Sequence, residues 1–420
     1  MEHRIRFDEL RLALEEFANR HGVDSKRVGK VLEAALKRTF EYKYRYAHPK
    51  PQVDAQVDLD KGEVKVILTY PDGSKEPEVI YPTDLSIDDV HTLKNYFVQM
   101  IKYDIQKSKL SKIQSYIGKI VTGKVQKVDR KRGVLLGVSV GDVDVEGRIE
   151  PSGMVKDEIY RPGQDIEAVV LSIEERSNYP LVLSRAHPSF VRALLEKIPE
   201  VADGTVQIRA IAREAGVMTK VAVSSTDSYV SPVTALLGKR GMRLMTVRRR
   251  LPKNEQIEVV QYDPDKVRFA VLALSPAENA VAAYETEDEI RVYYENEDDL
   301  GRAKGKEGLN VILASRLVGK KIMALPISEY EPPEEGITLY DIKDKLPPQI
   351  YEKMKKAALV YFRKLPPLVH IQRLLDVDEA TAIRVLDVLE EALREKAQSR
   401  LRKTQEQERD EEKKEIEDNA

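Results

Sequence analysis

The chain has 420 residues, 42% of them hydrophobic, so it is long enough for about three or four domains with buried cores. Its 69 basic and 71 acidic residues give a formal net charge of −2, so any surface for a polyanion must be local. The absence of cysteine excludes disulfide bonds, zinc knuckles and thiol catalysis. No apolar run has the length of a signal peptide or a membrane span, so we expect a cytoplasmic protein with no membrane partner.

The first 114 residues are predicted to form a helical α+β domain. Two apolar stripes at helical spacing predict two helices, and their residues are Phe7, Leu10, Leu14 and Phe17, then Val28, Val31, Leu32, Ala35 and Leu36. Ser25 is predicted to cap the second helix, and Ser86 to begin a long helix that reaches about Ile113. Between them, segments 53–59 and 64–69 alternate like strands around Asp60-Lys61-Gly62, which predicts a hairpin.

From Ile117 the pattern changes to that of strands. Five β-rich segments are separated by Gly, Asp or Pro-Gly, and they are 117–128, 133–140, 143–149, 165–173 and 180–184. Five strands within about 70 residues fit an OB-type β-barrel at 115–190, although another small barrel also fits the pattern. Such barrels stack nucleic-acid bases on aromatic side chains, but only Tyr160 and Tyr179 are aromatic here. RNA contacts by the barrel would therefore depend on basic residues, namely Lys124, Lys127 and Arg130.

Residues 199–326 contain an internal repeat with the order β-β-α-GxxG-α-β. Its first copy has strands at 205–212, 220–224 and 256–261, and helices at 233–237 and 242–250. The second has strands at 279–284, 289–294 and 321–325, and helices at 298–303 and 309–317. The loops are Gly238-Lys239-Arg240-Gly241 and Gly305-Lys306-Glu307-Gly308. Two detailed copies favour tandem KH (α/β) domains, at 198–275 and 276–328.

A GxxG loop between two helices can bind nucleic acid, although a lone GxxG is a weak signal. Glycines allow close approach of sugar-phosphate, and the helix that follows directs free N–H groups at it. KH domains hold about four nucleotides in this way and read bases on an apolar groove. The predicted groove walls of the first copy are Ile211, Val233, Leu236 and Leu237, with Ile257 and Val259 behind them.

The two loops differ in charge. Residues 239–253 carry seven basic residues and no acidic one, namely Lys239, Arg240, Arg243, Arg248, Arg249, Arg250 and Lys253. Such a run is often only a solvated helix face, but beside a phosphate-binding loop it favours an RNA track. The second loop is predicted to bind through Gly305, Lys306 and Gly308, weakened by the charge of Glu307. We therefore expect one strong and one weaker RNA site.

No constellation of residues points to catalysis. The six histidines are scattered without metal-ligand spacing, and no P-loop, nucleophile elbow or HExxH motif is present. We expect no metal, no cofactor and no enzyme activity.

The C-terminal extension (residues 331–420) begins with a change of composition at Glu331-Pro332-Pro333. Amphipathic helices are predicted at 346–362 and 368–393, broken by Pro347-Pro348 and Pro366-Pro367. The polar remainder, from about 394, is predicted to be a frayed helix or disordered.

The order of these parts resembles the bacterial NusA family of transcription elongation, pausing and termination factors over about residues 1–327. Five segments are similar to family motifs, and they are 160–163, 183–190, 211–214, 274–277 and 314–319. The resemblance implies that the N-terminal domain binds RNA polymerase near the RNA exit channel. It also implies that the barrel and KH folds bind nascent single-stranded RNA, and that other antitermination factors are partners.

The resemblance implies a function in pausing, intrinsic termination and antitermination. Glu307 stands where the family is usually basic, which again weakens the second loop. The extension does not resemble the acidic repeats of some members, so it implies nothing for 331–420. An accessory protein of an RNA-degradation complex, which can also combine an OB barrel with KH folds, stays open as an alternative, and so does a nuclease.

Overall fold

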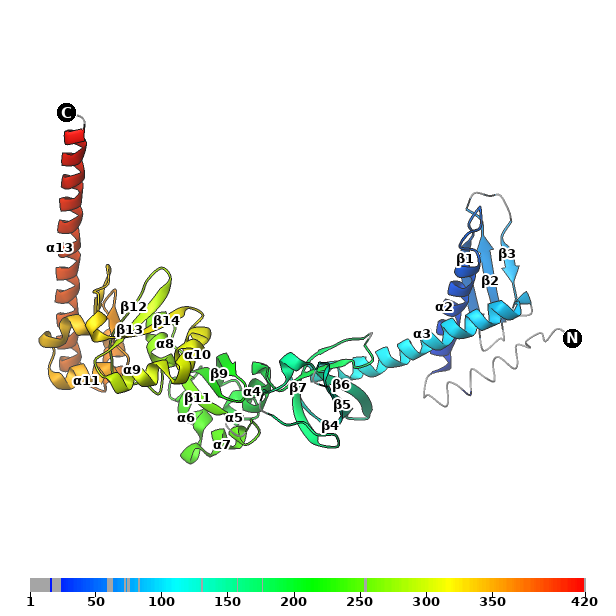
Figure 1. Cartoon of the computed structure of the whole chain (residues 1–420), viewed down its shortest axis with the longest axis horizontal. Helices are drawn as coiled ribbons and strands as arrows, with labels where there is room; N and C mark the ends of the chain where they lie inside the picture. The colour runs from blue at the N-terminus through cyan, green and yellow to red at the C-terminus, as the bar shows by residue number, and fades with distance from the viewer. Residues whose placement is uncertain are drawn as a thin grey trace. The chain divides into compact units, whose positions relative to one another are not determined.

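The computed structural model describes residues 16, 24–58, 63–71, 73, 76–81, 84–129, 131–156, 158–175, 177–252 and 255–418. Over these residues the chain is α+β, as predicted, with a helical N-terminal part, a closed five-stranded barrel, two KH-type folds and a helical extension (Figure 1). None of its described helices is long and apolar enough to span a membrane.

The N-terminal part is an antiparallel sheet that shares one core with helices α2 (Ser25–Lys43) and α3 (Ile87–Ile113). The strands, which lie in this order in the sheet, are β1 (Gln52–Asp58), β2 (Glu63–Thr69) and β3 (Glu78–Ile80). Residues at helical spacing on both helices, such as Leu36 and Ile101, are buried against this sheet. The predicted helix from Phe7 to Phe17 lies outside the described residues.

The two predicted helix caps of this part differ in outcome. Ser86 caps α3 as predicted, since its hydroxyl accepts from the Asp89 N–H at 3.2 Å while the Asp89 carboxylate accepts from the Ser86 N–H. The prediction for Ser25 was wrong by one residue, because Asp24 is the N-cap of α2. The predicted hairpin is confirmed by the pairing of Asp58 with Glu63, although its turn lies outside the described residues.

All five predicted barrel strands are confirmed. They are β4 (Ile120–Asp129), β5 (Gly133–Val140), β6 (Val143–Ile149), β7 (Asp165–Ile173) and β8 (Leu181–Ser184). They close in the order β4-β5-β6-β8-β7, and β4 pairs with β7 so that Lys124 lies opposite Asp165. Along β4, Val121 and Val125 are buried while Lys124 is exposed, which is the alternation that a barrel wall requires.

The predicted repeat is also confirmed. The first copy comprises β9 (Val206–Glu214), β10 (Met218–Ser225), α6 (Pro232–Leu237), α7 (Met242–Arg248) and β11 (Gln256–Gln261). The second comprises β12 (Ala280–Glu285), β13 (Glu289–Tyr294), α9 (Glu297–Lys304), α10 (Leu309–Val318) and β14 (Lys321–Pro326). In each sheet the second strand of the copy is central, antiparallel to the first and parallel to the last. A helix precedes each copy, α4 (Pro188–Leu195) and α8 (Lys266–Ala273).

A buried lysine ties the first KH sheet to the start of the second fold. Helix α8, which precedes the second copy, and helix α10 of that copy contact the first sheet, and Lys220 on β10 is fully buried. Its ammonium donates to Glu258 Oε2 at 2.6 Å and to the Ser275 carbonyl at 2.5 Å. Burial lowers the pKa of Lys220, and the neighbouring Glu258 carboxylate opposes that shift. The joint between the copies is thus held from within the first sheet.

A second buried ion pair holds the segment that enters the first copy. The Arg213 and Glu255 side chains are both 0% exposed and make two hydrogen bonds, of 2.7 and 2.8 Å. Arg213 also donates to the carbonyls of Arg185 and His187, just before α4. Glu255 accepts from the Gly216 N–H and the Thr219 hydroxyl as well. Burial alone would raise the pKa of Glu255, but Arg213 and these donors lower it overall.

The extension shares a core with the second KH fold. Its elements are β15 (Ile337–Thr338), α11 (Pro348–Lys356), β16 (Tyr361–Phe362), α12 (Leu368–Leu375) and α13 (Glu379–Asp418). Buried residues such as Leu339 and Met354 belong to the same cluster as Tyr293 of β13. The Tyr330 ring packs edge-on against Tyr293, with centroids 5.2 Å apart. The composition change at residue 331 is therefore not a break in the core.

Two predicted helices of the extension differ from the structure. The segment predicted as one helix at 346–362 ends its helix at Lys356, and Ala358 has φ +55° before the short strand β16. The predicted helix at 368–393 is broken at Asp376, whose φ is +49°, so this segment forms two helices, α12 and α13, joined by a short turn. The charged remainder is helical to Asp418.

Replacing Arg213 by methionine should lower the free energy of unfolding by about 3–5 kcal/mol, because Glu255 would stay buried without its cation. Urea unfolding followed by circular dichroism at pH 7 measures this. Arg316→Met is the matched control, since its pair with Glu214 is exposed and should contribute about 0–1 kcal/mol. Because the pKa of Glu255 is lowered by folding, the wild-type advantage should decline as pH falls below about 4.5. Equal, small effects of both substitutions would contradict this role.

Leu339→Ala should lower the free energy of unfolding by about 2–5 kcal/mol, because this side chain is fully buried in the core shared with the second KH fold. Hydrogen exchange should show faster exchange of the β12 and β13 amides as well as of the extension. Leu401→Ala, at a 63% exposed position of α13, is the control and should change nothing measurable. Unchanged protection of β12 and β13 would mean that the extension is an independent unit.

Candidate nucleic-acid interface

The two GxxG loops have nearly the same backbone. The first glycines, Gly238 and Gly305, have φ,ψ of 67°,−178° and 70°,174°. The third residues, Arg240 and Glu307, share a positive φ of 55° with ψ of 29° and 23°. Each loop is a tight turn before a helix start, closed by the N–H of its last glycine, which donates to the carbonyl of its first glycine at 3.1 Å in the first loop and 3.2 Å in the second.

The first glycine of each loop is required by a side chain packed beneath it. A Cβ at Gly238 would lie 2.6 Å from Arg243 Cγ, and one at Gly305 would lie 2.6 Å from Asn310 Cβ and 2.9 Å from its backbone nitrogen. A Cβ at the last glycine, Gly241 or Gly308, would meet nothing within 4 Å. This open side is where the backbone of a ligand can approach.

Arg243 and Asn310 occupy the same position of the repeat and have the same local contact. Arg243 Nη1 donates to the Ala235 carbonyl and to both carboxylate oxygens of Glu200, at 2.7–2.8 Å. Asn310 is buried, and its Nδ2 donates to the carbonyls of Arg302 and Ala303. Both side chains cap the carbonyl end of the first helix, so the guanidinium of Arg243 is engaged within the protein.

The predicted cations of the first copy fall into two groups. Lys239, Arg240, Arg248 and Arg249 are exposed and, among the described residues, make no ion pair. Arg250 is half-buried and binds Glu167 of β7 through two hydrogen bonds of 2.8 and 2.5 Å. That pair connects the end of the first copy's helices to the barrel strand β7, and Lys253 lies outside the described residues.

An open pocket of about 1030 Å³ adjoins the first loop. Its lining includes Gly238, Lys239 and Arg240, together with Tyr229 from the preceding loop. Sequence reasoning missed Tyr229, although an aromatic residue in the polar stretch Asp227-Ser228-Tyr229 was a usable signal. Glu200, the acidic residue of this pocket, is neutralised by Arg243.

Fewer residues can line the apolar groove of the first copy than the sequence predicts. Val233 and Leu237 of α6 remain partly exposed, opposite the half-buried Ile257 and Val259 of β11. Leu236 is fully buried in the core, so it cannot be a groove wall. Ile211 lies on β9, which the central strand β10 separates from β11.

The second loop has a weaker electrostatic setting. Lys304, Lys306 and Glu307 are all exposed, so the acidic group lies at the loop surface beside the lysines. The like charges of a phosphate chain and the Glu307 carboxylate repel each other.

The barrel offers cations rather than aromatic platforms. Lys124 and Lys127 are exposed on β4, while Arg130 lies outside the described residues. Tyr160 is buried, accepts from the Val155 N–H and donates to Glu158, so its ring is not available for stacking. Burial also raises the pKa of Tyr160.

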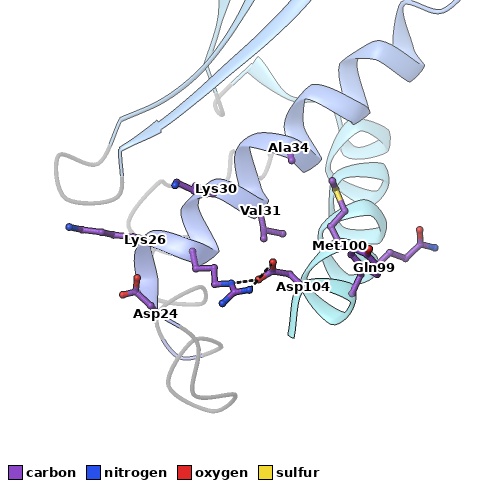
Figure 2. Close-up of a pocket in the computed structure, with 10 residues that line it drawn as sticks. Asp24, Lys26, Lys30, Val31, Ala34, Gln99, Met100 and Asp104 are labelled. Atoms are coloured by element: carbon purple, nitrogen blue, oxygen red, sulfur yellow. Dashed lines mark hydrogen bonds and ion pairs between the residues drawn. The ribbon is translucent and has the colours of Figure 1, made fainter. Parts of the chain in front are cut away.

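A separate pocket of about 770 Å³ lies between α2 and α3 (Figure 2). Its rim is basic, with Lys26 and Lys30 exposed, and its floor includes Val31 and Met100. Arg27 closes one side through an ion pair with Asp104. No three His, Asp or Glu side chains of the described residues come together as a metal site.

Comparisons with known proteins agree with this geometry. A model of the NusA-like first KH domain matches residues 185–262. The transcription termination/antitermination protein NusA of Mycobacterium tuberculosis is 31% identical over 293 residues, which cover 67% of this chain and 83% of that protein. NusA of Thermus thermophilus is 28% identical over 345 residues, or 74% of this chain and 88% of that protein. NusA of Bacillus subtilis is 33% identical over 205 residues, or 48% and 54%.

The mycobacterial relative is matched over most of its length at substantial identity, and the family model covers the copy with the basic loop. The chain therefore belongs to the NusA family of transcription termination/antitermination proteins.

Proposed function

We propose that this NusA-family protein modulates pausing, intrinsic termination and antitermination by holding nascent single-stranded RNA on its first KH fold while its N-terminal domain binds RNA polymerase. The observation that carries the RNA site is the Gly238–Gly241 loop, in which Lys239 and Arg240 are exposed and make no ion pair with any residue that the structure describes. The protein acts in the cytoplasm, by binding and not as an enzyme.

We assign the proposed roles to the predicted domains. Residues 1–114 form the polymerase-binding domain, 115–190 the barrel, 198–275 and 276–328 the KH domains, and 331–420 the extension. The relatives are NusA proteins, and none of their names points to RNA degradation, so nothing favours the accessory-protein alternative.

The cations of the first copy have two proposed roles. Lys239, Arg240, Arg248 and Arg249 contact phosphates, because their charges are exposed and unpaired within the described part. Arg243 and Arg250, which are held by Glu200 and Glu167, position the loop and the helix behind it. Lys306 and the glycines of the second loop add a weaker site, and Lys124, Lys127 and Arg130 extend the track along the barrel.

Exchanging the third residues of the loops tests the proposed asymmetry. Arg240→Glu should weaken binding to an unstructured single-stranded RNA by roughly tenfold or more, since a hydrogen bond to a charged group is worth about 1.5–3 kcal/mol. Glu307→Arg should strengthen it. Both positions have φ 55°, so the two exchanges should have similar effects on backbone strain. Filter binding over a salt series measures the affinity and also the number of phosphate contacts.

Arg402→Glu, an exposed charge reversal on α13, is the control for net charge. Asp substitutions at the first glycines are less suitable, because at Gly305 the new Cβ would meet the Asn310 backbone and would disturb folding. If Arg240→Glu bound RNA as tightly as Arg402→Glu does, the proposed RNA site would be wrong.

Removal of residues 1–105 should abolish association with RNA polymerase and leave RNA affinity unchanged. The cut keeps Leu110 and Ile113, which are buried near the end of α3. Co-purification with polymerase, alongside RNA filter binding of the same sample, separates the two activities. Full recovery of polymerase by the truncated protein would place the polymerase site elsewhere in the chain.

A further inference from the structure

Tyr229 is the unusual feature of the pocket beside the first loop. Its side chain is 96% exposed, although an aromatic ring of this size is costly to leave in water. It shares the pocket with Gly238, Lys239 and Arg240. Eight residues (230–237) separate it from Gly238, and six of them form α6, which is about 9 Å long. A KH-bound segment of about four nucleotides can reach both.

The backbone that carries Tyr229 is held by several hydrogen bonds. The Tyr229 N–H donates to Asp227 Oδ1 at 2.9 Å, and the Asp227 N–H donates to Ser225 Oγ at 3.1 Å. The Thr226 N–H donates to the Thr205 carbonyl at 2.9 Å, and the Val230 N–H to the Asp227 carbonyl at 3.2 Å. The exposure of the ring is therefore built into an ordered turn, as in an Asx-turn.

A residue of the extension also holds this turn. Arg373 of α12 donates from Nη2 to the Ser228 carbonyl, one residue before Tyr229. α12 is anchored by Ile371 and Leu375, which are buried in the core shared with the second KH fold. The turn is thus fixed from outside the first copy, by a segment that sequence resemblance does not cover.

Charge identifies the kind of molecule that fits beside this ring. Lys239 and Arg240 are unpaired among the described residues, and the carboxylate of Glu200 is neutralised by Arg243. A partner must therefore be anionic and must also offer a flat apolar face. Single-stranded RNA has both, because every base has a π-face and every nucleotide has a phosphate.

We propose that Tyr229 stacks on a base of the RNA whose backbone is bound by the Gly238–Gly241 loop, and that Arg373 is a positioning residue for it. The inference rests on the proposed RNA binding and names the contact that this site makes with a base. Stacking reads a π-face rather than a hydrogen-bond pattern, so it adds affinity at any sequence.

The test uses the full chain and two probes of equal length, an unstructured RNA of adenines and cytosines and its abasic counterpart. Tyr229→Ala should weaken binding of the base-containing RNA by about 5- to 100-fold, and Tyr229→Phe should bind like the wild type. The slope of log affinity against log salt should stay unchanged, whereas Lys239→Ala should reduce it by about 0.7–1. The abasic probe should bind wild type and Tyr229→Ala equally.

Two further variants complete the test. Tyr46→Ala, at an 81% exposed tyrosine of the N-terminal part, should not change RNA affinity. Arg373→Ala should weaken binding in the wild-type background but not in Tyr229→Ala, because residues that act through one another are not additive. Additive losses would overturn the positioning role.

The outcomes distinguish this inference from the function on which it rests. If Arg240→Glu reduces RNA affinity but Tyr229→Ala does not, the stacking proposal is wrong and the RNA site stands. If Tyr229→Ala weakens binding of the abasic probe as much as binding of the base-containing RNA, the ring does not contact a base. If the wild type fails to bind either probe, the proposed RNA binding itself is wrong.

Discussion

The ammonium group of Lys220 is buried away from solvent and needs protein oxygens as partners, and one of these is the carbonyl of Ser275 at the joint between the KH folds. The preceding carbonyl, of Leu274, accepts from Asn310 of the second fold. Two consecutive carbonyls of the joint are therefore held, one from each fold. These two hydrogen bonds hold the second KH fold, and with it the second GxxG loop, against the first fold.

The two GxxG loops share one backbone conformation but differ in charge. Their dihedral angles agree within a few degrees, and a side chain beneath each first glycine caps the helix before it. The difference lies in the third residue, Arg240 or Glu307, whose side chain extends from the same left-handed position. Because the backbone geometry is shared, the charge of this residue is the basis of the proposed difference in RNA affinity between the two loops.

Most of the fold could be predicted because its signals are local. Glycines, strand alternation and helical stripes place the barrel and both KH copies within a few residues. The errors have a non-local cause. Leu236 looks like a groove residue until the packing of α6 buries it, and the partners of Arg243 and Arg250 are the distant Glu200 and Glu167. A run of basic residues in a sequence does not show which of its members an internal carboxylate has already engaged.

The extension shows most clearly that local sequence signals do not reveal long-range contacts. Its prolines and charged residues suggested a tail beyond the RNA-binding folds, yet its apolar residues complete the core on which the second KH sheet depends. Through that shared core Arg373 reaches the Ser228 carbonyl and touches the turn that exposes Tyr229. A segment without a recognisable motif thus bears on the shape of the pocket beside the first loop.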